Sequence, residues 1–519
     1  MTVASPPSTS PRSTANARRD AIAGQSPPDL ARAAMLAPFL ADLDRYLTTL
    51  DPLAIDRAHH IPPEVLRTLA DLGVFGASIP ERFGGTDLGL AGATAIVETL
   101  ARRDRALATT VGLHLGLGTR GLVAFASPDQ QARWLPGLAS GQTIAAFGTT
   151  EANAGSDLAR LQTRAVVRGD RVTVQGEKLY VTNGGLAGLY TLTVAVTGFG
   201  DFQASRALVF LERSDPGLVV GREEDKLGLR GSSTTALHLD VDVPADRLLG
   251  PPGAGPDQLA HILAWGRTAM AAGCCGTAQA ALDLTLQHVR LRQQFGRPLA
   301  AQPVVRAQLA DMIATLTTMR ALVAATTRAS DDLERERLSL SSKIMASDGD
   351  CAICDQALQL HGGSGYLEDT GLSLLLRDAR VTRIFEGAND VLLTRLGQLE
   401  LTMPRAAPPD HPLSLLLTTQ LEPALERGLA ALRDPLVLHR IGRLALLRDA
   451  ALALAALAAD PHRLTPRMPR PTAADLAHAE SRLLEAARAH LVRRDLDTTE
   501  LIARHVLDQR DQDAQEAVS

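Results

Sequence analysis

Residues 169–175 read Gly-Asp-Arg-Val-Thr-Val-Gln, a turn followed by alternating apolar and polar side chains. Alternation with a period of two, carried by β-branched residues after a Gly-Asp turn, predicts a β-strand. Similar short runs occupy residues 190–196, 207–211 and 236–243. Several strands at this spacing, separated by turn residues, predict a small β-barrel or sandwich over residues 146–253.

Long helical periodicity flanks this β region on both sides. In residues 29–145, apolar residues such as Val65 and Leu69 recur at helical spacing, and Gly73 ends that run. The same periodicity returns over residues 254–402. The order of helices, strands and helices predicts an α+β multidomain protein with an N-terminal α-helical domain, a middle β domain and a C-terminal helical bundle. It also suggests that a cofactor lies at the junction between the layers.

The two ends of the chain differ from this core. Residues 1–28 are rich in Ser, Pro, Ala and Arg, which predicts a disordered tail, with a transit peptide as the alternative. Residues 403–519 begin with a Pro-rich linker and continue as about three helical segments, a helical C-terminal extension. Within it, the apolar segment 436–459 is expected to pack on its own bundle or across a dimer, rather than lie at a membrane surface.

Composition narrows the class of protein. The chain has 519 residues, of which 45% are hydrophobic, and is long enough for roughly three or four domains. Its net charge of −5 and aromatic share of 3% argue against nucleic-acid binding. Four cysteines in so long a chain fit a reducing compartment. No uninterrupted apolar run reaches the length needed to cross a bilayer.

Three short motifs imitate functional sites. Cys351 and Cys354 form a C-x-x-C inside a helical run and are interpreted as buried thiols. Residues 116–121 match G-x-G-x-x-G, but their flanks are helical, so we interpret the glycines as close helix packing. His59 and His60 are interpreted as a surface pair at a helix end. No metal site is expected.

A carboxylate in an apolar context is the first candidate for catalysis. Residues 380–390 read Arg-Val-Thr-Arg-Ile-Phe-Glu-Gly-Ala-Asn-Asp, so that Glu386 follows Ile384 and Phe385 and precedes Gly387. Poor solvation of its charged form would raise the pKa of Glu386 and make it a stronger base once ionised. Most glutamates are solvated surface residues, however, so this interpretation depends on the other motifs of the chain.

Further segments occur with Glu386 in a specific order. Together they resemble the motifs of the acyl-CoA dehydrogenase family, over about residues 61–398, and the chain looks most like the very-long-chain class with its C-terminal helical extension. The segments are 147–157 (FGTTEANAGSD), 178–185 (KLYVTNGG), 226–234 (KLGLRGSST), 292–298 (RQQFGRP), 359–366 (QLHGGSGY) and 384–387 (IFEG).

The resemblance implies an FAD enzyme with a four-helix-bundle C-terminal domain, the cofactor lying between the β domain and the bundle and touching a neighbouring subunit. Threonine hydroxyls can donate to flavin heteroatoms, and an arginine fork suits pyrophosphate. By position, the residues expected beside the flavin are Phe147, Thr149, Thr150, Ser156, Tyr180 and Thr182. Those expected to hold pyrophosphate and adenosine are Arg292 and Phe295, with Gln359 and Gly363, the two pairs coming from different subunits.

The resemblance also implies a reaction, the α,β-dehydrogenation of long-chain acyl-CoA thioesters in fatty acid β-oxidation. Glu386 matches the family's base, which removes the pro-R α-proton while hydride passes to flavin N5. The Glu386 backbone N–H and a ribityl hydroxyl would polarise the thioester carbonyl. Ser156, Arg267, Phe385 and Gly387 are expected to contact the substrate. Electrons would then pass to an electron-transfer flavoprotein.

Departures from the family pattern keep other functions open. Ala388 stands where relatives usually carry Thr, Ala152 where Pro is usual, and Ala264 where several short- and medium-chain relatives have Asp. One alternative is a dehydrogenase or oxidase for acyl groups on a carrier protein in secondary metabolism. Another is a non-catalytic FAD-binding assembly protein. We expect a homodimer, cytoplasmic or, in a eukaryote, in the mitochondrial matrix, with possible peripheral membrane contact through the extension.

Overall fold

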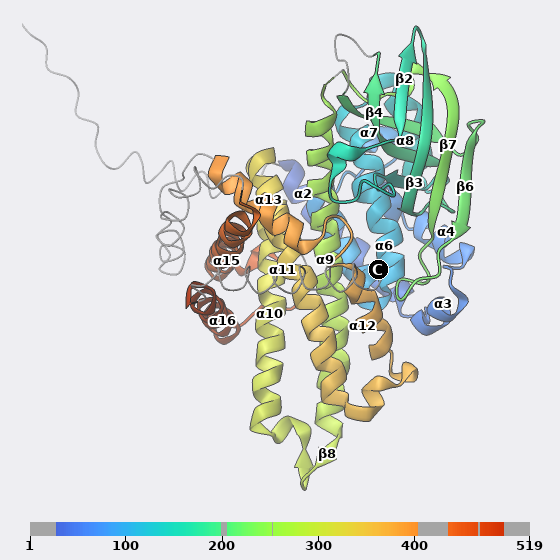
Figure 1. Cartoon of the computed structure of the whole chain (residues 1–519). Coiled ribbons are helices and arrows are strands. Elements are labelled where there is room, and N and C mark those ends of the chain that lie inside the picture. The colour runs from blue at the N-terminus through green and yellow to red at the C-terminus, as the bar shows by residue number, and fades with distance from the viewer. Residues whose placement is uncertain (1–26, 199–204, 252, 403–433, 465–467, 493–519) are drawn as a thin grey trace, which may run out of the picture.

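The computed structural model describes residues 27–198, 205–251, 253–402, 434–464 and 468–492 (Figure 1). N-terminal helices and a β-sheet form the upper part of the molecule, and long helices run down from them. The predicted α+β order of helices, sheet and helices is therefore confirmed. Residues 1–26 of the predicted tail lie outside the described residues.

The N-terminal helices pack around a core of leucine, isoleucine and valine side chains. Side-chain caps fix the starts of three of them, at Asp51, Asp104 and Ser127. Asp104 accepts a hydrogen bond from the Leu107 N–H at 2.7 Å, and Ser127 and Gln130 form a reciprocal capping box. The helices are α2 (Pro27–Leu47), α3 (Pro52–Ala58), α4 (Pro63–Asp71), α5 (Gly89–Arg103), α6 (Arg105–Leu113), α7 (Thr119–Phe125) and α8 (Pro128–Ala139).

A π-helical turn, His114–Gly118, separates α6 from α7, although the helical pattern of residues 106–126 predicts one continuous helix there. The buried His114 ring bonds the Ala145 N–H through Nδ1 at 3.0 Å and the Phe75 carbonyl through Nε2 at 3.2 Å. Burial lowers the pKa of His114 to about 4, so the ring is neutral at pH 7. A Cβ on Gly118 would lie 2.6 Å from Ala145 Cβ. Close packing therefore explains this G-x-G-x-x-G, as predicted.

The middle domain is a single seven-stranded sheet in the order β1-β4-β2-β3-β7-β6, with β5 pairing β4. In β7, residues 237, 239, 241 and 243 are buried and the intervening residues are exposed, the period-two pattern that the sequence predicts. The strands are β1 (Ala145–Gly148), β2 (Arg164–Arg168), β3 (Arg171–Thr182), β4 (Leu189–Thr197), β5 (Ser205–Glu212), β6 (Leu218–Glu223) and β7 (Thr234–Pro244).

The C-terminal domain is built on three long helices that pack through small and apolar side chains. Cys351 and Cys354 lie in one of them as free cysteines, and the prediction of buried thiols is confirmed for Cys354, whereas Cys351 is only partly buried. The helices are α9 (Gly255–Leu291), α10 (Pro303–Thr327), α11 (Asp332–His361), α12 (Leu372–Val381) and α13 (Asn389–Thr402), and a short hairpin of β8 (Gln293–Gln294) and β9 (Arg297–Pro298) follows α9.

Two helices of the extension, α15 (Pro435–Ala459) and α16 (Ala473–Val492), pack on this bundle (Figure 1). Asp449 of α15 is fully buried, where it pairs with Arg337 and accepts a hydrogen bond from Ser341 Oγ at 2.6 Å. The segment 436–459 therefore packs on its own bundle. The helix expected within residues 413–433 and the end of the last helix lie outside the described residues.

Among the described helices, α10 alone is long and apolar enough to cross a membrane by length and composition. The sequence predicts no uninterrupted apolar run of that length. However, 67% of the apolar window of α10 is buried inside the protein. Its apolar character is thus explained by its place between α9, α11 and the extension.

Candidate functional site

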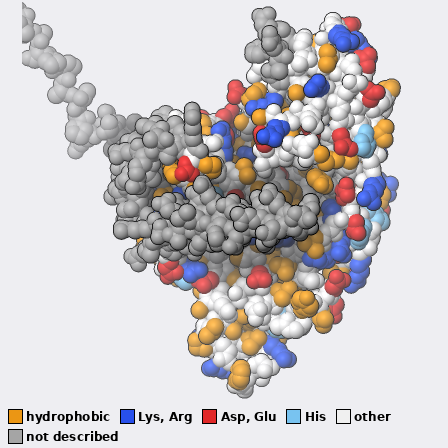
Figure 2. All heavy atoms as spheres, viewed as in Figure 1, with side chains coloured by type: hydrophobic (Ala, Val, Ile, Leu, Met, Phe, Trp, Pro, Cys, Tyr) orange, Lys and Arg blue, Asp and Glu red, His pale blue; other side chains and the backbone are white. Residues whose placement is uncertain are grey.

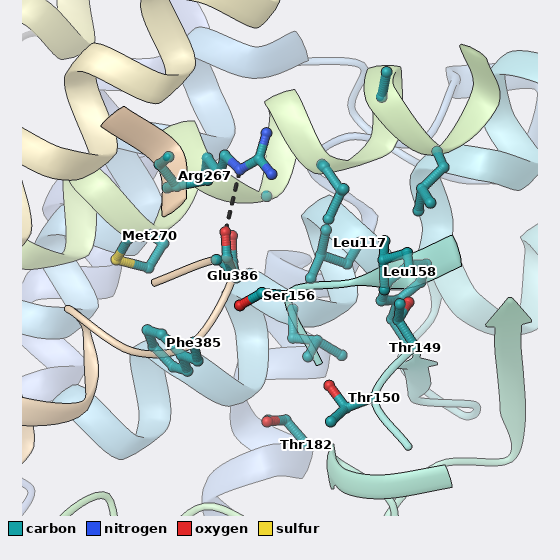
Figure 3. A pocket seen from close by; sticks show the side chains of 18 of the residues that line it. Leu117, Thr149, Thr150, Ser156, Leu158, Thr182, Arg267, Met270, Phe385 and Glu386 are labelled. Carbon is teal, nitrogen blue, oxygen red and sulfur yellow. Dashed lines mark hydrogen bonds between the residues drawn. The ribbon is translucent and has the colours of Figure 1, made fainter. Parts of the chain in front are cut away.

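A cavity of about 800 Å³ opens where α6, α9, the sheet and the loop before α13 meet (Figure 3). Its volume is in the range of small-molecule sites, about 300–1,000 Å³. Residues 147–182 approach it from the sheet, and residues 385–387 from the opposite side. The predicted site residues that line it are Phe147, Thr149, Thr150, Ser156, Tyr180, Thr182, Arg267, Phe385, Glu386 and Gly387.

Glu386 lies in the short loop between α12 and α13 in an unusual backbone conformation. Its φ angle is +54°, in the left-handed region that non-glycine residues rarely adopt. Gly387 follows at φ +102°, and a Cβ there would meet Leu392 at 2.6 Å. Such conformations persist only where the surrounding structure imposes them, and they cluster at functional sites.

Two cations from neighbouring helices hold this loop. Arg267 of α9 donates from Nε to the Glu386 carbonyl at 3.2 Å (Figure 3). Lys343 of α11, which is fully buried, donates to the Gly387 carbonyl and to Asn389 Oδ1, both at 2.7 Å. Three elements distant in sequence thus fix the position of one carboxylate.

The electrostatic setting of Glu386 shifts the pKa of its carboxyl towards neutrality. The residue is half-buried, and its Oε2 is buried without a hydrogen-bond partner. Burial raises the pKa of the Glu386 carboxyl to about 7. The charges of Arg267 and Lys343, and then of Arg105, oppose that rise. The same burial lowers the pKa of Lys343 to about 8.

We therefore expect kcat/KM to depend on the ionisation of Glu386. Only the carboxylate can accept a proton, so activity should rise with pH and reach half of its plateau at about 7. The measurement is kcat/KM as a function of pH, which reports ionisations of the free enzyme. An acid limb centred below about 5, near the ordinary pKa of a glutamate, would contradict this burial effect.

The sheet side of the cavity has the features of a flavin site. The hydroxyl of Thr149 is buried and has no partner. Tyr180 is 65% exposed and has φ +56°, next to the irregularity in β3 between Lys178 and Val181. Beneath this surface Lys178 bonds buried Glu151 at 2.6 Å and anchors the loop after β1. A ring available for stacking and an orphaned donor fit a planar heteroaromatic cofactor.

Four predicted cofactor residues do not line this cavity. Arg292 and Phe295 lie at the hairpin β8–β9, at the lower end of the bundle in Figure 1, and Phe295 is 92% exposed. Gln359 and Gly363 lie at the end of α11 and in the following turn. The structure thus does not bring them to the other site residues within one chain. Their role across a subunit boundary stays a prediction.

Three residues that act on Glu386 or leave room for it were not predicted from the sequence. In the sequence, Lys343 is a single charged residue within a helical segment. No neighbouring residue indicates that it binds the Gly387 carbonyl. Gly266 leaves room for the base, since a Cβ there would lie 3.1 Å from Glu386 Oε2. Arg105 lines the cavity although it is only 3% exposed. Asp104, which precedes it, indicates the start of a helix but does not indicate that Arg105 is buried.

Comparisons with known proteins agree with this geometry. Residues 48–142, 146–241 and 253–399 match the N-terminal, middle and C-terminal domain models of acyl-CoA dehydrogenases. An acyl-CoA dehydrogenase of Bacillus subtilis is 33% identical over 343 residues, which are 65% of this chain and 89% of that protein. The very long-chain specific acyl-CoA dehydrogenase of Homo sapiens mitochondria is 33% identical over 353 residues, 66% of this chain and 54% of that one.

A solved structure extends the likeness to the additional helices. The acyl-CoA dehydrogenase from Bacillus anthracis, complexed with FAD, superposes with a TM-score of 0.74 at 24% identity, and the match covers 92% of this chain and 90% of that chain. The fold resemblance therefore reaches beyond the three domains that the family models describe. The chain belongs to the acyl-CoA dehydrogenase family of FAD-dependent oxidoreductases.

Proposed function

We propose that this protein catalyses α,β-dehydrogenation of acyl-CoA thioesters, with Glu386 as the base that removes the α-proton. The observation that carries the proposal is a carboxylate with a pKa of about 7 on a loop whose backbone Arg267 and Lys343 bind, at the wall of a cavity that the predicted flavin residues also line. FAD, when bound, supplies the two-electron oxidation. The residues around it orient the substrate and exclude water.

The backbone of the same loop can polarise the thioester. An α-proton is weakly acidic, so its removal requires stabilisation of the charge that develops on the carbonyl oxygen. Among the described residues, no acceptor pairs with the Glu386 N–H. This donor is thus available to the thioester carbonyl while the side chain of the same residue takes the proton. Arg267 fixes both groups by binding the Glu386 carbonyl.

Several finer expectations belong to this proposal. The likeness to very long-chain relatives favours a long acyl chain, and the family resemblance makes an electron-transfer flavoprotein the expected acceptor. Exposed hydrophobic residues near the lower end of the bundle favour a homodimer, because a second copy would cover them (Figure 2). They are Leu291, Phe295, Val304, Tyr366 and Leu367.

The proposal is tested by anaerobic titration of the FAD-loaded protein with acyl-CoAs of graded length. We expect bleaching of oxidised flavin by at least one acyl-CoA, with rapid reoxidation by an electron-transfer flavoprotein. Faster reduction by an acyl-carrier protein, or rapid formation of hydrogen peroxide in air, would favour the carrier-protein enzyme. If no thioester of either kind bleaches the flavin, the protein is a non-catalytic FAD-binding protein instead.

A further inference from the structure

The cavity continues from Glu386 in two directions that differ in character. One is lined by residues at the protein surface, among them Asp257, Arg395 and Gln398, and opens to solvent. The other is lined by buried side chains of α5, α6 and α9, including Val97 and Met270. The open direction suits the long polar CoA moiety, and the closed one suits the acyl group.

The closed direction contains a buried cation, Arg105 at the first position of α6. Its side chain lines the cavity and is 3% exposed. The guanidinium packs closely on α9, since a Cβ on Gly273 would lie 1.8 Å from Arg105 Nη1. The positive charge of Arg105, like those of Arg267 and Lys343, also favours the ionised form of Glu386. An arginine therefore occupies a region that a purely hydrocarbon chain would require to be apolar.

The described part of the chain does not neutralise this arginine. Nη2 donates to the Met270 carbonyl at 3.3 Å and to Cys274 Sγ at 3.5 Å, two uncharged and distant acceptors. Nε is buried and has no partner. Asp350 lies near enough to interact with Arg105, but burial raises its pKa to about 7 and it forms no ion pair with the guanidinium. A buried, unpaired guanidinium is costly unless a ligand completes its hydrogen bonds.

We propose that Arg105 binds a carboxylate carried by the acyl group, at the end remote from the thioester. The substrate class would then be ω-carboxyacyl-CoA thioesters, whose second carboxylate matches the planar guanidinium in charge and geometry. A methyl-ended chain would instead place hydrocarbon against an unpaired cation. The inference rests on the proposed function for the location of the thioester, and it specifies the substrate of the same site.

The first test measures binding without turnover. FAD-loaded Glu386→Gln protein is titrated with ω-carboxyacyl-CoAs of graded length, each against the methyl-ended acyl-CoA of equal carbon number. At the best length we expect the carboxylated thioester to bind about 10- to 100-fold more tightly, the range for a charged hydrogen bond. Tighter binding of the methyl-ended thioester at every length would overturn the inference. This binding test does not depend on turnover. If no thioester reduces the wild-type flavin, the proposed function is contradicted, but the binding preference can still be measured.

The second test assigns the effect to Arg105. In the same background, Arg105→Met keeps the length of the side chain and removes its charge. It should abolish the preference for the carboxylated thioester and improve binding of the methyl-ended one. The matched control is Arg102→Met, which alters an exposed arginine paired with Asp283 and leaves the cavity unchanged. A preference that survives Arg105→Met would contradict the assignment. If Arg105→Met does not bind FAD, Arg105→Lys takes its place. Lysine keeps the positive charge but lacks the planar guanidinium, so the preference for the carboxylated thioester should be reduced in part.

Discussion

Glu386→Gln is expected to give a folded, FAD-loaded protein whose flavin is no longer reduced by acyl-CoA. The amide is close in size to the carboxyl group, and the hydrogen bond from Arg267 reaches the backbone, so the substitution removes no contact that holds the loop. Loss of a positioned general base lowers rates by about 10²–10⁴-fold. The measurement is the anaerobic rate of flavin bleaching in rapid mixing.

Two variants control this result. Glu386→Asp keeps the charge but withdraws it by one methylene, so we expect a partial loss of rate. Glu368→Gln makes the same chemical change at an exposed position in the turn Glu368–Thr370 and should be as fast as wild type. Bleaching by Glu386→Gln at the wild-type rate would remove Glu386 from the role of base.

Lys343→Met is expected to destabilise the fold around the loop and to lower the ionised fraction of Glu386 at neutral pH. It leaves the Gly387 carbonyl without its donor, whereas Asn389 Oδ1 keeps a hydrogen bond from Ser347 Oγ at 3.2 Å. One unpaired acceptor costs about 1–3 kcal/mol, so the free energy of unfolding should fall by about that amount. Removal of the positive charge also raises the pKa of Glu386 further, which should move the acid limb of kcat/KM to higher pH.

Thermal unfolding of the FAD-loaded protein and kcat/KM against pH measure the two effects separately. Ser342→Ala is the matched control, because Ser342 is the buried neighbour of Lys343 and its hydroxyl has no hydrogen-bond partner. It should leave both quantities near wild type. An unshifted acid limb in Lys343→Met would show that the lysine does not act on the base.

Local patterns predicted most of the architecture. The period-two alternation of residues 171–175 and 236–243 became β3 and β7, and the flanking helical periodicity became the two helical domains. The break between α6 and α7 was not predicted, because it depends on buried His114 bonding Phe75 and Ala145 from other elements. Tertiary contacts of His114 therefore determine where the helix is interrupted, and the local sequence pattern does not contain this information.

The candidate site was predicted in part, for a similar reason. Motif order indicated the residues on both walls of the cavity, including Glu386 and Arg267. Lys343 and Arg105 were missed, because a single basic residue in a helix is usually a solvated surface group. The packing of α11 and α6 against α9 helps to bury these two charges, and this packing cannot be seen in the local sequence. The motifs also predicted a set of four cofactor residues that do not line the cavity within one chain. They are Arg292, Phe295, Gln359 and Gly363.

The most direct test of Glu386 as the base separates proton removal from oxidation. A 3-thiaacyl-CoA has sulfur in place of the β-carbon, so its α-proton can leave although no β-hydrogen is available. In deuterated water, wild-type protein with FAD should exchange the α-proton at a rate that rises with pH through about 7, as followed by proton NMR. Glu386→Gln should show only the uncatalysed exchange. Equal exchange by both proteins would contradict the account.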